Sequence, residues 1–214
     1  MFPLPFPLQL FKKAAGALLP QDCSLCGGAT LSSLVCDECL RSLPHASRES
    51  RVVAAFEYRF PLDRLVHRFK FGGDLALGRW LGSQLASRTA LEPRPDLIVA
   101  PPLAASRLRA RGFNQALVLA GIVARQHRAH VAVRALERIR DTPPQHLLSR
   151  AARRRNLRGA FRCGLRLDGL RVAIVDDVVT TGATADAIAR LLVRQGAREV
   201  AVWAVARTPA PGER

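Results

Sequence analysis

The stretch VAIVDDVVTTGATADAIARLL (residues 172–192) joins three kinds of sequence in immediate succession. The apolar run 172–175 has the composition of a buried strand, and two acids, Asp176 and Asp177, follow it at once. Hydroxyl-bearing and small residues come next, as far as Thr184, and then apolar residues at helical spacing. The pattern predicts a strand that ends at two carboxylates, a tight turn and a helix.

The rest of the chain repeats this alternation of strand and helix. Strand composition marks residues 51–58, 96–102, the neighbourhood of 131–138, 170–177 and 198–206. Helical periodicity marks residues 61–71, 75–89, 113–126 and 183–195, and a further short helix is expected over 8–19. Strands that alternate with helices predict an α/β fold, a mostly parallel sheet with helices on both faces.

Arginine dominates the charge of the chain. The formal net charge is +16, and lysine occurs only at positions 12, 13 and 70. The excess reflects either a genome that favours arginine codons or a phosphate-rich partner, because a guanidinium pairs with phosphate through two parallel hydrogen bonds. Local clusters at 107–111 and 150–158 would suit a polyphosphate ligand or nucleic acid.

The chain carries no membrane or export signal that we recognise. No apolar run is long enough to cross a bilayer. The N-terminal segment MFPLPFPLQLFKK places its lysines after the apolar part and contains three early prolines, which is unlike a signal peptide. We therefore expect a cytoplasmic protein.

Four of the five cysteines fall in one short segment, CSLCGGATLSSLVCDEC. They are Cys23, Cys26, Cys36 and Cys39, in the pattern C-x2-C-x9-C-x2-C. Four thiolates suit tetrahedral Zn²⁺, so the spacing predicts a structural zinc site. Two disulfides or a redox-active pair are the alternatives, although nothing else indicates a secreted chain.

The turn after the acids has the features of a phosphate site. A helix start offers free N–H groups and the positive end of the helix dipole. Gly182 allows the tight turn, and threonines at 180, 181 and 184 add hydroxyl donors. Neither a Walker loop nor G-x-G-x-x-G is present. Because carboxylates would repel phosphate, the acids are expected to face hydroxyl groups or Mg²⁺, and a ribose 5-phosphate meets both requirements. The alternative is a plain strand–turn–helix with two solvated acids.

VAIVDDVVTTGAT closely resembles the phosphoribosyl diphosphate (PRPP) motif of type I phosphoribosyltransferases. Five other segments occur with this motif in the order typical of the ComF family of competence proteins. They are the four-cysteine segment, VHRFKFGGD, RLRARGFNQA, TPPQ and LSRAARRRNLRGAF. The resemblance covers about residues 15–207 and departs at VAPPL, where VPVPL is common. It implies a type I phosphoribosyltransferase-like domain over 46–214 and an N-terminal helix and zinc module over 1–45.

The resemblance also implies roles for individual residues. Asp176 and Asp177 are the catalytic candidates and would contact the ribose hydroxyls. The residues implied to hold the 5-phosphate of PRPP are Thr180, Thr181, Gly182, Ala183 and Thr184, and Val178 and Val179 are also implied to bind PRPP. The cations implied to bind elsewhere on PRPP are Lys70, Arg107, Arg109 and Arg111, and a lid or DNA contact is implied for Arg153, Arg154, Arg155 and Asn156. Each of these cations could instead be an ordinary surface charge.

Three functions remain open at this point. The first is a transferase that moves phosphoribosyl from PRPP to an unknown acceptor base with Mg²⁺ and releases pyrophosphate. The second is a competence factor that binds single-stranded DNA and acts with the DNA-uptake machinery, with PRPP as effector. The third is a PRPP sensor without turnover. PRPP binding is common to all three.

Overall fold

The computed structural model describes residues 21–30, 33–47, 51–140, 157 and 159–209. The chain forms two compact units, Met1–Leu43 and Pro44–Arg214. The helix expected over 8–19 lies outside the described residues. No helix in the described ranges has the length and apolar character needed to cross a bilayer.

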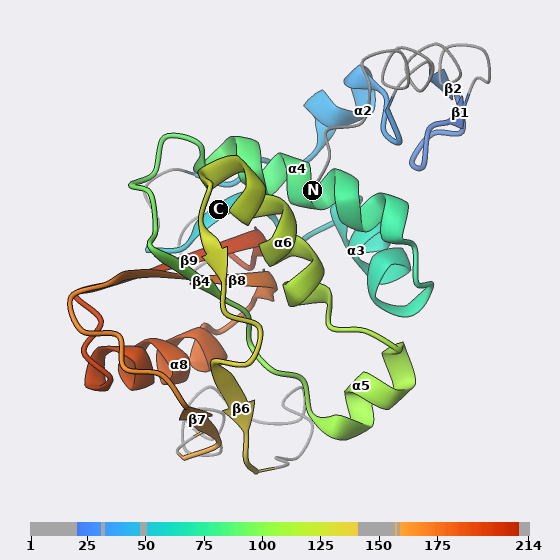
Figure 1. The fold of residues 1–214 in the computed structure, drawn as a ribbon. Coiled ribbons are helices and arrows are strands. Elements are labelled where there is room, and N and C mark those ends of the chain that lie inside the picture. Colours follow the sequence, from blue (N-terminus) through green and yellow to red (C-terminus); the bar gives the residue numbers. More distant parts are fainter. Residues whose placement is uncertain (1–20, 31–32, 48–50, 141–156, 158, 210–214) are drawn as a thin grey trace, which may run out of the picture. The chain divides into compact units, whose positions relative to one another are not determined.

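A five-stranded sheet forms the centre of the larger unit (Figure 1). Its strands are β3 (Val53–Glu57), β4 (Leu97–Val99), β5 (His130–Val131), β8 (Arg171–Val179) and β9 (Glu199–Arg207). They stand in the order β3-β9-β8-β4-β5, and every neighbouring pair is parallel. This confirms the predicted parallel sheet.

Helices cover both faces of this sheet. Helices α4 (Leu75–Thr89) and α6 (Gln115–His127) pack against each other and against the sheet on one face, and α3 (Leu62–Phe71) packs on α4. Helix α8 (Ala183–Arg194) lies on the opposite face (Figure 1). Val172 and Ile174 of β8 are buried in one cluster with Ile188 of α8. Because side chains alternate along a strand, Ala173 and Val175 must face the other layer.

Two helices of the larger unit, α4 and α6, begin at a residue whose side chain caps them. Asp74 accepts a hydrogen bond from the Leu77 amide at the start of α4, and Asn114 accepts one from the Ala116 amide at the start of α6. Gly78 on α4 lies against the Phe69 ring of α3, where a methyl group would overlap the ring. Small residues on α4 therefore allow the close approach of α3.

The region predicted as one strand over 131–138 is two strands in different sheets. His130–Val131 pairs with β4 as the edge of the central sheet, and β6 (Leu136–Arg138) pairs with β7 (Phe161–Cys163) in a separate antiparallel pair. The Ala135 amide donates to the Ala132 carbonyl between them, which closes a turn. Strand composition could not reveal that turn.

Helix α5 (Ala105–Arg111) was not among the predicted helices. None of its residues is buried, so no apolar periodicity marks it. It ends at Gly112, whose φ of 76° is the left-handed cap that glycine favours.

Strand β8 continues beyond the point where the sequence analysis ended it. It includes Asp176 and Asp177 and runs to Val179, which pairs with Arg207 of β9. Pairing with the long strand β9 extends β8 two residues past its predicted end at 177, so the two acids lie inside the strand and not at its end.

The smaller unit is built around the four cysteines. Strands β1 (Gln21–Asp22) and β2 (Ala29–Thr30) form an antiparallel pair, and α2 (Asp37–Ser42) begins at Cys36, whose sulfur accepts from the Cys39 amide.

Candidate functional site

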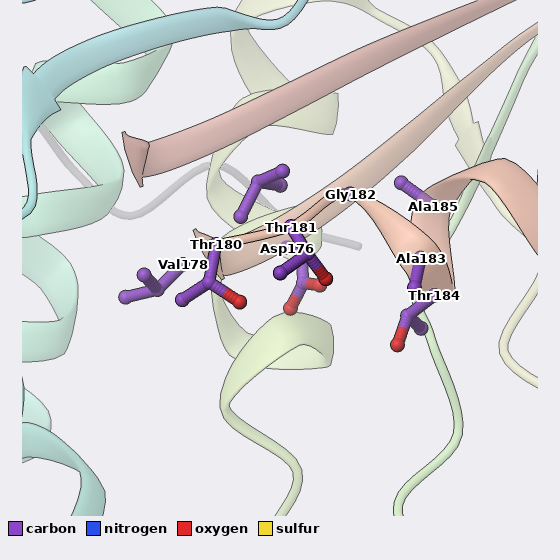
Figure 2. Close-up of a pocket in the computed structure, with 9 residues that line it drawn as sticks. Asp176, Val178, Thr180, Thr181, Gly182, Ala183, Thr184 and Ala185 are labelled. Carbon is purple, nitrogen blue, oxygen red and sulfur yellow. The ribbon is translucent and has the colours of Figure 1, made fainter. Parts of the chain in front are cut away.

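A pocket opens where β8 turns into α8 (Figure 2). Its volume is about 40 Å³, and it is lined by Asp176 and residues 178–185. The side-chain oxygens of Asp176, Thr180 and Thr184 point to the same side of the turn (Figure 2). The turn thus presents one carboxylate and several hydroxyl groups to the same space.

The backbone of the turn is shaped for an anion. Gly182 precedes α8 in the left-handed conformation, with a φ of 73°, and no side chain caps the helix. The first N–H groups of an α-helix have no partner within the helix, so those of α8 are available to a ligand. Together with the helix dipole they favour a negatively charged group at this end.

The pocket lies where the order of the parallel sheet reverses. The connection from β4 to β5 carries α6 on one face, and the connection from β8 to β9 carries α8 on the other. The chain therefore leaves β4 and β8 in opposite directions, and such a point is where open α/β sheets bind ligands. Val99 at the end of β4 pairs with Ile174, so residues 175–179 of β8 extend past β4. Asp176 and Asp177 belong to this part of β8, which has no pairing partner on the β4 side.

Asp176 and Asp177 face opposite sides of β8, because side chains alternate along a strand. Asp176 faces the same layer as Val172 and Ile174 and lines the pocket beside α8. Asp177 faces the layer of α3 and α6, where its Oδ1 lies 2.9 Å from Nζ of Lys70. One acid therefore borders the pocket, and the other is paired with a cation.

The two acids also differ in their environment. Burial and, next to it, the negative charge of Asp177 raise the pKa of Asp176, the Asp177 amide and Lys70 oppose the rise, and the net result is a pKa of about 7. The Asp177 amide donates to Oδ1 of Asp176 at 2.8 Å. Near neutral pH, Asp176 is therefore close to its own midpoint and can exchange a proton with a ligand or solvent.

Lys70 and Arg111 are the two predicted cations that the structure brings to the acids. Lys70 is at the end of α3, and its side chain is only 16% exposed beside Asp177. Arg111 is at the end of α5; burial lowers the pKa of its guanidinium, while the charge of Asp177 raises it. Arg107 is half-buried, and its charge also acts on Arg111, whereas Arg109 is exposed. None of these four cations lines the pocket itself.

The predicted lid cannot be placed, since Arg153, Arg154, Arg155 and Asn156 lie outside the described residues. The predicted residues at the turn, 178–184, all line the pocket, and Ala185 also lines it although it was not predicted to. Gln115 is the first residue of α6 and is buried. In the structure this residue contacts both Arg111 and Lys70.

The four cysteines of the smaller unit converge on one point. Their sulfur atoms all lie within 4.8 Å of one another, and those of Cys26 and Cys36 are 3.9 Å apart. Four sulfurs at about 2.3 Å from a tetrahedral Zn²⁺ would be about 3.8 Å apart. No disulfide joins any of the five cysteines. The arrangement fits a metal centre.

Backbone groups and thiol ionisation are also consistent with a metal centre. Amides of Leu25 and Cys36 donate to the Cys23 sulfur; burial raises the pKa of this thiol, but these and other hydrogen bonds lower it to about 6. The pKa of the Cys39 thiol is raised to about 12; its hydrogen bond to the Cys36 side chain is the largest cause, and burial is the second. Four neighbouring thiolates repel one another, so full ionisation of the set requires a bound cation.

Fold and site together define a parallel α/β protein that has a pocket at a strand–helix turn and a separate four-cysteine unit. The chain is 40% identical over 193 residues to DNA utilization protein YhgH of Escherichia coli K12, covering 87% of this chain and 84% of that protein. It is 34% identical over 181 residues to Competence protein F of Haemophilus influenzae, covering 80% and 78%. The chain therefore belongs to the ComF family of competence and DNA-utilization proteins, and the resemblance found in the sequence is confirmed.

Other comparisons are weaker. Competence protein ComFC of Bacillus subtilis is 29% identical over 182 residues, covering 81% of this chain and 72% of that protein. Solved structures similar to the chain include an adenine phosphoribosyl transferase from Trypanosoma brucei, with a TM-score of 0.45, 11% identity, and coverage of 75% of this chain and 73% of that one. A purine phosphoribosyltransferase from Pyrococcus horikoshii has a TM-score of 0.40, 20% identity, and coverage of 64% and 78%. No protein-family model matches the chain.

Proposed function

We propose that this protein binds PRPP with Mg²⁺ at the β8–α8 turn and transfers the phosphoribosyl group to an acceptor base, releasing pyrophosphate. The composition of the pocket lining is the observation that supports this proposal. It combines the Asp176 carboxylate with the uncapped start of a twelve-residue helix. A ligand that fits it needs hydroxyl groups beside a phosphate, as in ribose 5-phosphate.

The 5-phosphate is assigned to the start of α8. Its oxygens would accept from the first amides of the helix and from the hydroxyls of Thr180, Thr181 and Thr184. Gly182 keeps this approach open, since no atom lies within 4 Å of the position where a Cβ would stand. A larger residue there would also have to adopt a positive φ.

The ribose is assigned to the exposed part of β8. Asp176 borders the pocket and would accept hydrogen bonds from the ribose hydroxyls, which an ionised carboxylate does well. Asp177 would approach the sugar from the other side of the strand, near the step where β4 has ended. In this arrangement both acids act on the sugar, and the phosphate meets only amides and hydroxyls.

The diphosphate is assigned to the side of the acids that carries Lys70 and Arg111. Both cations are oriented around Asp177, and they would take up the negative charge of the departing pyrophosphate. Mg²⁺, held mainly by ligand oxygens and water, would supply further charge neutralisation. The contribution of the chain is to position the sugar and stabilise charge.

The smaller unit is proposed to hold one structural Zn²⁺ through Cys23, Cys26, Cys36 and Cys39. Closed sets of four thiolates leave no position for a substrate, so the metal would stabilise the fold of this unit and take no part in the transfer.

Calorimetric titration with PRPP and Mg²⁺ tests the proposal. Wild-type protein should bind PRPP and, more weakly, ribose 5-phosphate, whereas ribose without phosphate should not bind. Asp176→Asn should weaken PRPP binding about tenfold or more, because a charge-assisted hydrogen bond contributes about 1.5–3 kcal/mol. Asp168→Asn is the matched control, since this exposed acid pairs with Arg166 and does not line the pocket.

Turnover requires a second assay on the same sample. Pyrophosphate release would be followed while candidate bases are supplied with PRPP and Mg²⁺. Release that depends on one base, and that Asp176→Asn with Asp177→Asn abolishes, supports transfer. Binding without release across a broad set of bases would instead indicate a sensor.

A DNA-related role is the second candidate, and it is favoured by the names of the relatives, which refer to DNA utilization and competence. The protein would bind single-stranded DNA through its arginine clusters, with PRPP as effector. Binding should weaken steeply with salt, because phosphate contacts release counterions. Neutralising Arg153, Arg154 and Arg155 should reduce it, and lack of binding at low salt would exclude this role.

A further inference from the structure

A buried glutamine connects the two cations that flank Asp177. Gln115, the first residue of α6, is 1% exposed. Its Oε1 accepts from Nη1 of Arg111 at 3.0 Å, and its Nε2 donates to the backbone carbonyl of Lys70 at 3.4 Å. One side chain therefore links the end of α3, the end of α5 and the start of α6.

Each partner of Gln115 is a group that needs a hydrogen bond. The Lys70 carbonyl belongs to the last turn of α3, where carbonyls have no partner within the helix. Arg111 is half-buried, and burial disfavours its charge. A neutral amide that both accepts and donates satisfies the two groups at once, and an apolar residue of similar size would leave both unsatisfied.

The surrounding packing holds this link in place. The ring of Phe113 lies 5.7 Å from that of Phe69, so the start of α6 also contacts α3 through apolar groups. Phe71 directly follows Lys70 in the sequence, and the Arg111 guanidinium carbon lies over the Phe71 ring, 4.9 Å from its centroid. The position of α3 relative to α5 is thus determined around Gln115.

The link determines where two positive charges stand. Lys70 Nζ contacts Asp177 at 2.9 Å, and the charge of Asp177 also acts on Arg111. Both cations lie on the face of β8 opposite the Asp176 wall of the pocket. A ligand whose phosphate occupies the α8 turn would meet them only at its other, distal anionic end.

We propose that Gln115 is a positioning residue for the diphosphate: it holds Arg111 and Lys70 at the distal end of the ligand and does not touch the ligand itself. The inference rests on the proposed function, because it takes PRPP as the ligand. It adds a residue that selects diphosphate-bearing sugars over sugars with a single phosphate.

Selectivity between two ligands tests this role. PRPP and ribose 5-phosphate would each be titrated, with Mg²⁺, into wild-type protein and Gln115→Leu. Loss of hydrogen bonds to a charged group should weaken PRPP about tenfold, while ribose 5-phosphate, which lacks the diphosphate, should stay within about twofold. Retained binding of ribose 5-phosphate also shows that the variant is folded.

A double-mutant cycle separates positioning from a general structural role. Gln115→Leu would be introduced into a chain that already carries Arg111→Met and Lys70→Met. If Gln115 acts through these two cations, it should cause no further loss of PRPP affinity in that background. A further tenfold loss would overturn the proposal.

The outcomes separate the inference from the proposed function. Wild-type protein that binds neither ligand overturns the proposed function, and the inference with it. The inference alone is overturned if wild-type protein binds both ligands and Gln115→Leu either leaves both affinities unchanged or weakens both affinities equally. Selective loss of PRPP supports both.

Discussion

Replacing Asp176 by asparagine is expected to stabilise the folded protein at neutral pH while it weakens ligand binding. Asparagine resembles the protonated acid in size and polarity, and it carries no charge to bury. The carboxylate of Asp176 is desolvated and stands beside Asp177, so the folded state favours its protonated form. The acid is therefore retained at a cost in stability, which is common for groups in binding sites.

The pKa shift determines the size and the pH range of this effect. The pKa of Asp176 rises from 3.8 to about 7 on folding. Between these values the unfolded chain has released the proton and the folded chain has kept it, so stability falls as pH rises through this window. One pKa unit corresponds to about 1.4 kcal/mol, and the loss from pH 5 to pH 8 is therefore on the order of 2–3 kcal/mol.

Urea-induced unfolding at several pH values between 5 and 8 measures the effect. Both tryptophans of the chain lie in the larger unit, and Trp203 is 1% exposed, so fluorescence reports the unfolding of that unit. The free energy of unfolding of Asp176→Asn should exceed that of wild type by an amount that grows with pH. The growth should reach on the order of 2–3 kcal/mol by pH 8.

A control and a clear refutation accompany this measurement. Asp168→Asn makes the same chemical change on an exposed acid and should shift stability by no more than about 0.5 kcal/mol at any pH. If the difference between Asp176→Asn and wild type stays constant from pH 5 to pH 8, Asp176 ionises as it does in the unfolded chain. The reasoning from burial and the Asp177 charge would then be wrong.

Three further predictions, tested with four substitutions, concern other parts of the structure. Gly182→Ala should destabilise by about 1 kcal/mol and weaken PRPP binding in calorimetry, because it forces a positive φ on alanine; unchanged affinity would contradict the role of the turn. Gly78→Ala should lower the melting temperature through a loss of about 1–3 kcal/mol from overlap with the Phe69 ring. Gly121→Ala, in open space on α6, should be neutral or stabilising, so equal losses would contradict the packing argument. Cys26→Ser should reduce bound zinc well below one atom per chain in metal analysis, and full zinc content would exclude Cys26 as a ligand.

Much of the fold could be predicted because burial leaves a periodic trace. Helix α4 was expected over 75–89 and has those bounds, and the apolar run of β8 indicated a strand buried on both faces. Helix α5 left no such trace because it buries nothing. The turn between β5 and β6 was missed because residues 131–138 contain none of the residues that usually mark a turn, such as glycine, proline, asparagine or aspartate.

The candidate site divides in the same way. The pocket residues 178–184 are consecutive, so a motif could mark them. The end of β8 could not be predicted from its own residues, since its length is set by pairing with β9 as far as Val179.

By itself, the sequence determined the local features: the strand–turn–helix with its acids and glycine, and four cysteines close enough in the chain to share one metal. Only the tertiary structure decided that Lys70, Arg111 and Gln115 meet beside Asp177. The physical reason is that a turn is specified by neighbouring residues, whereas this cluster exists because α3 and the α5–α6 connection contact each other beside the sheet. That contact depends on apolar packing between residues far apart in the chain, such as Phe69 and Phe113, and no local pattern encodes it.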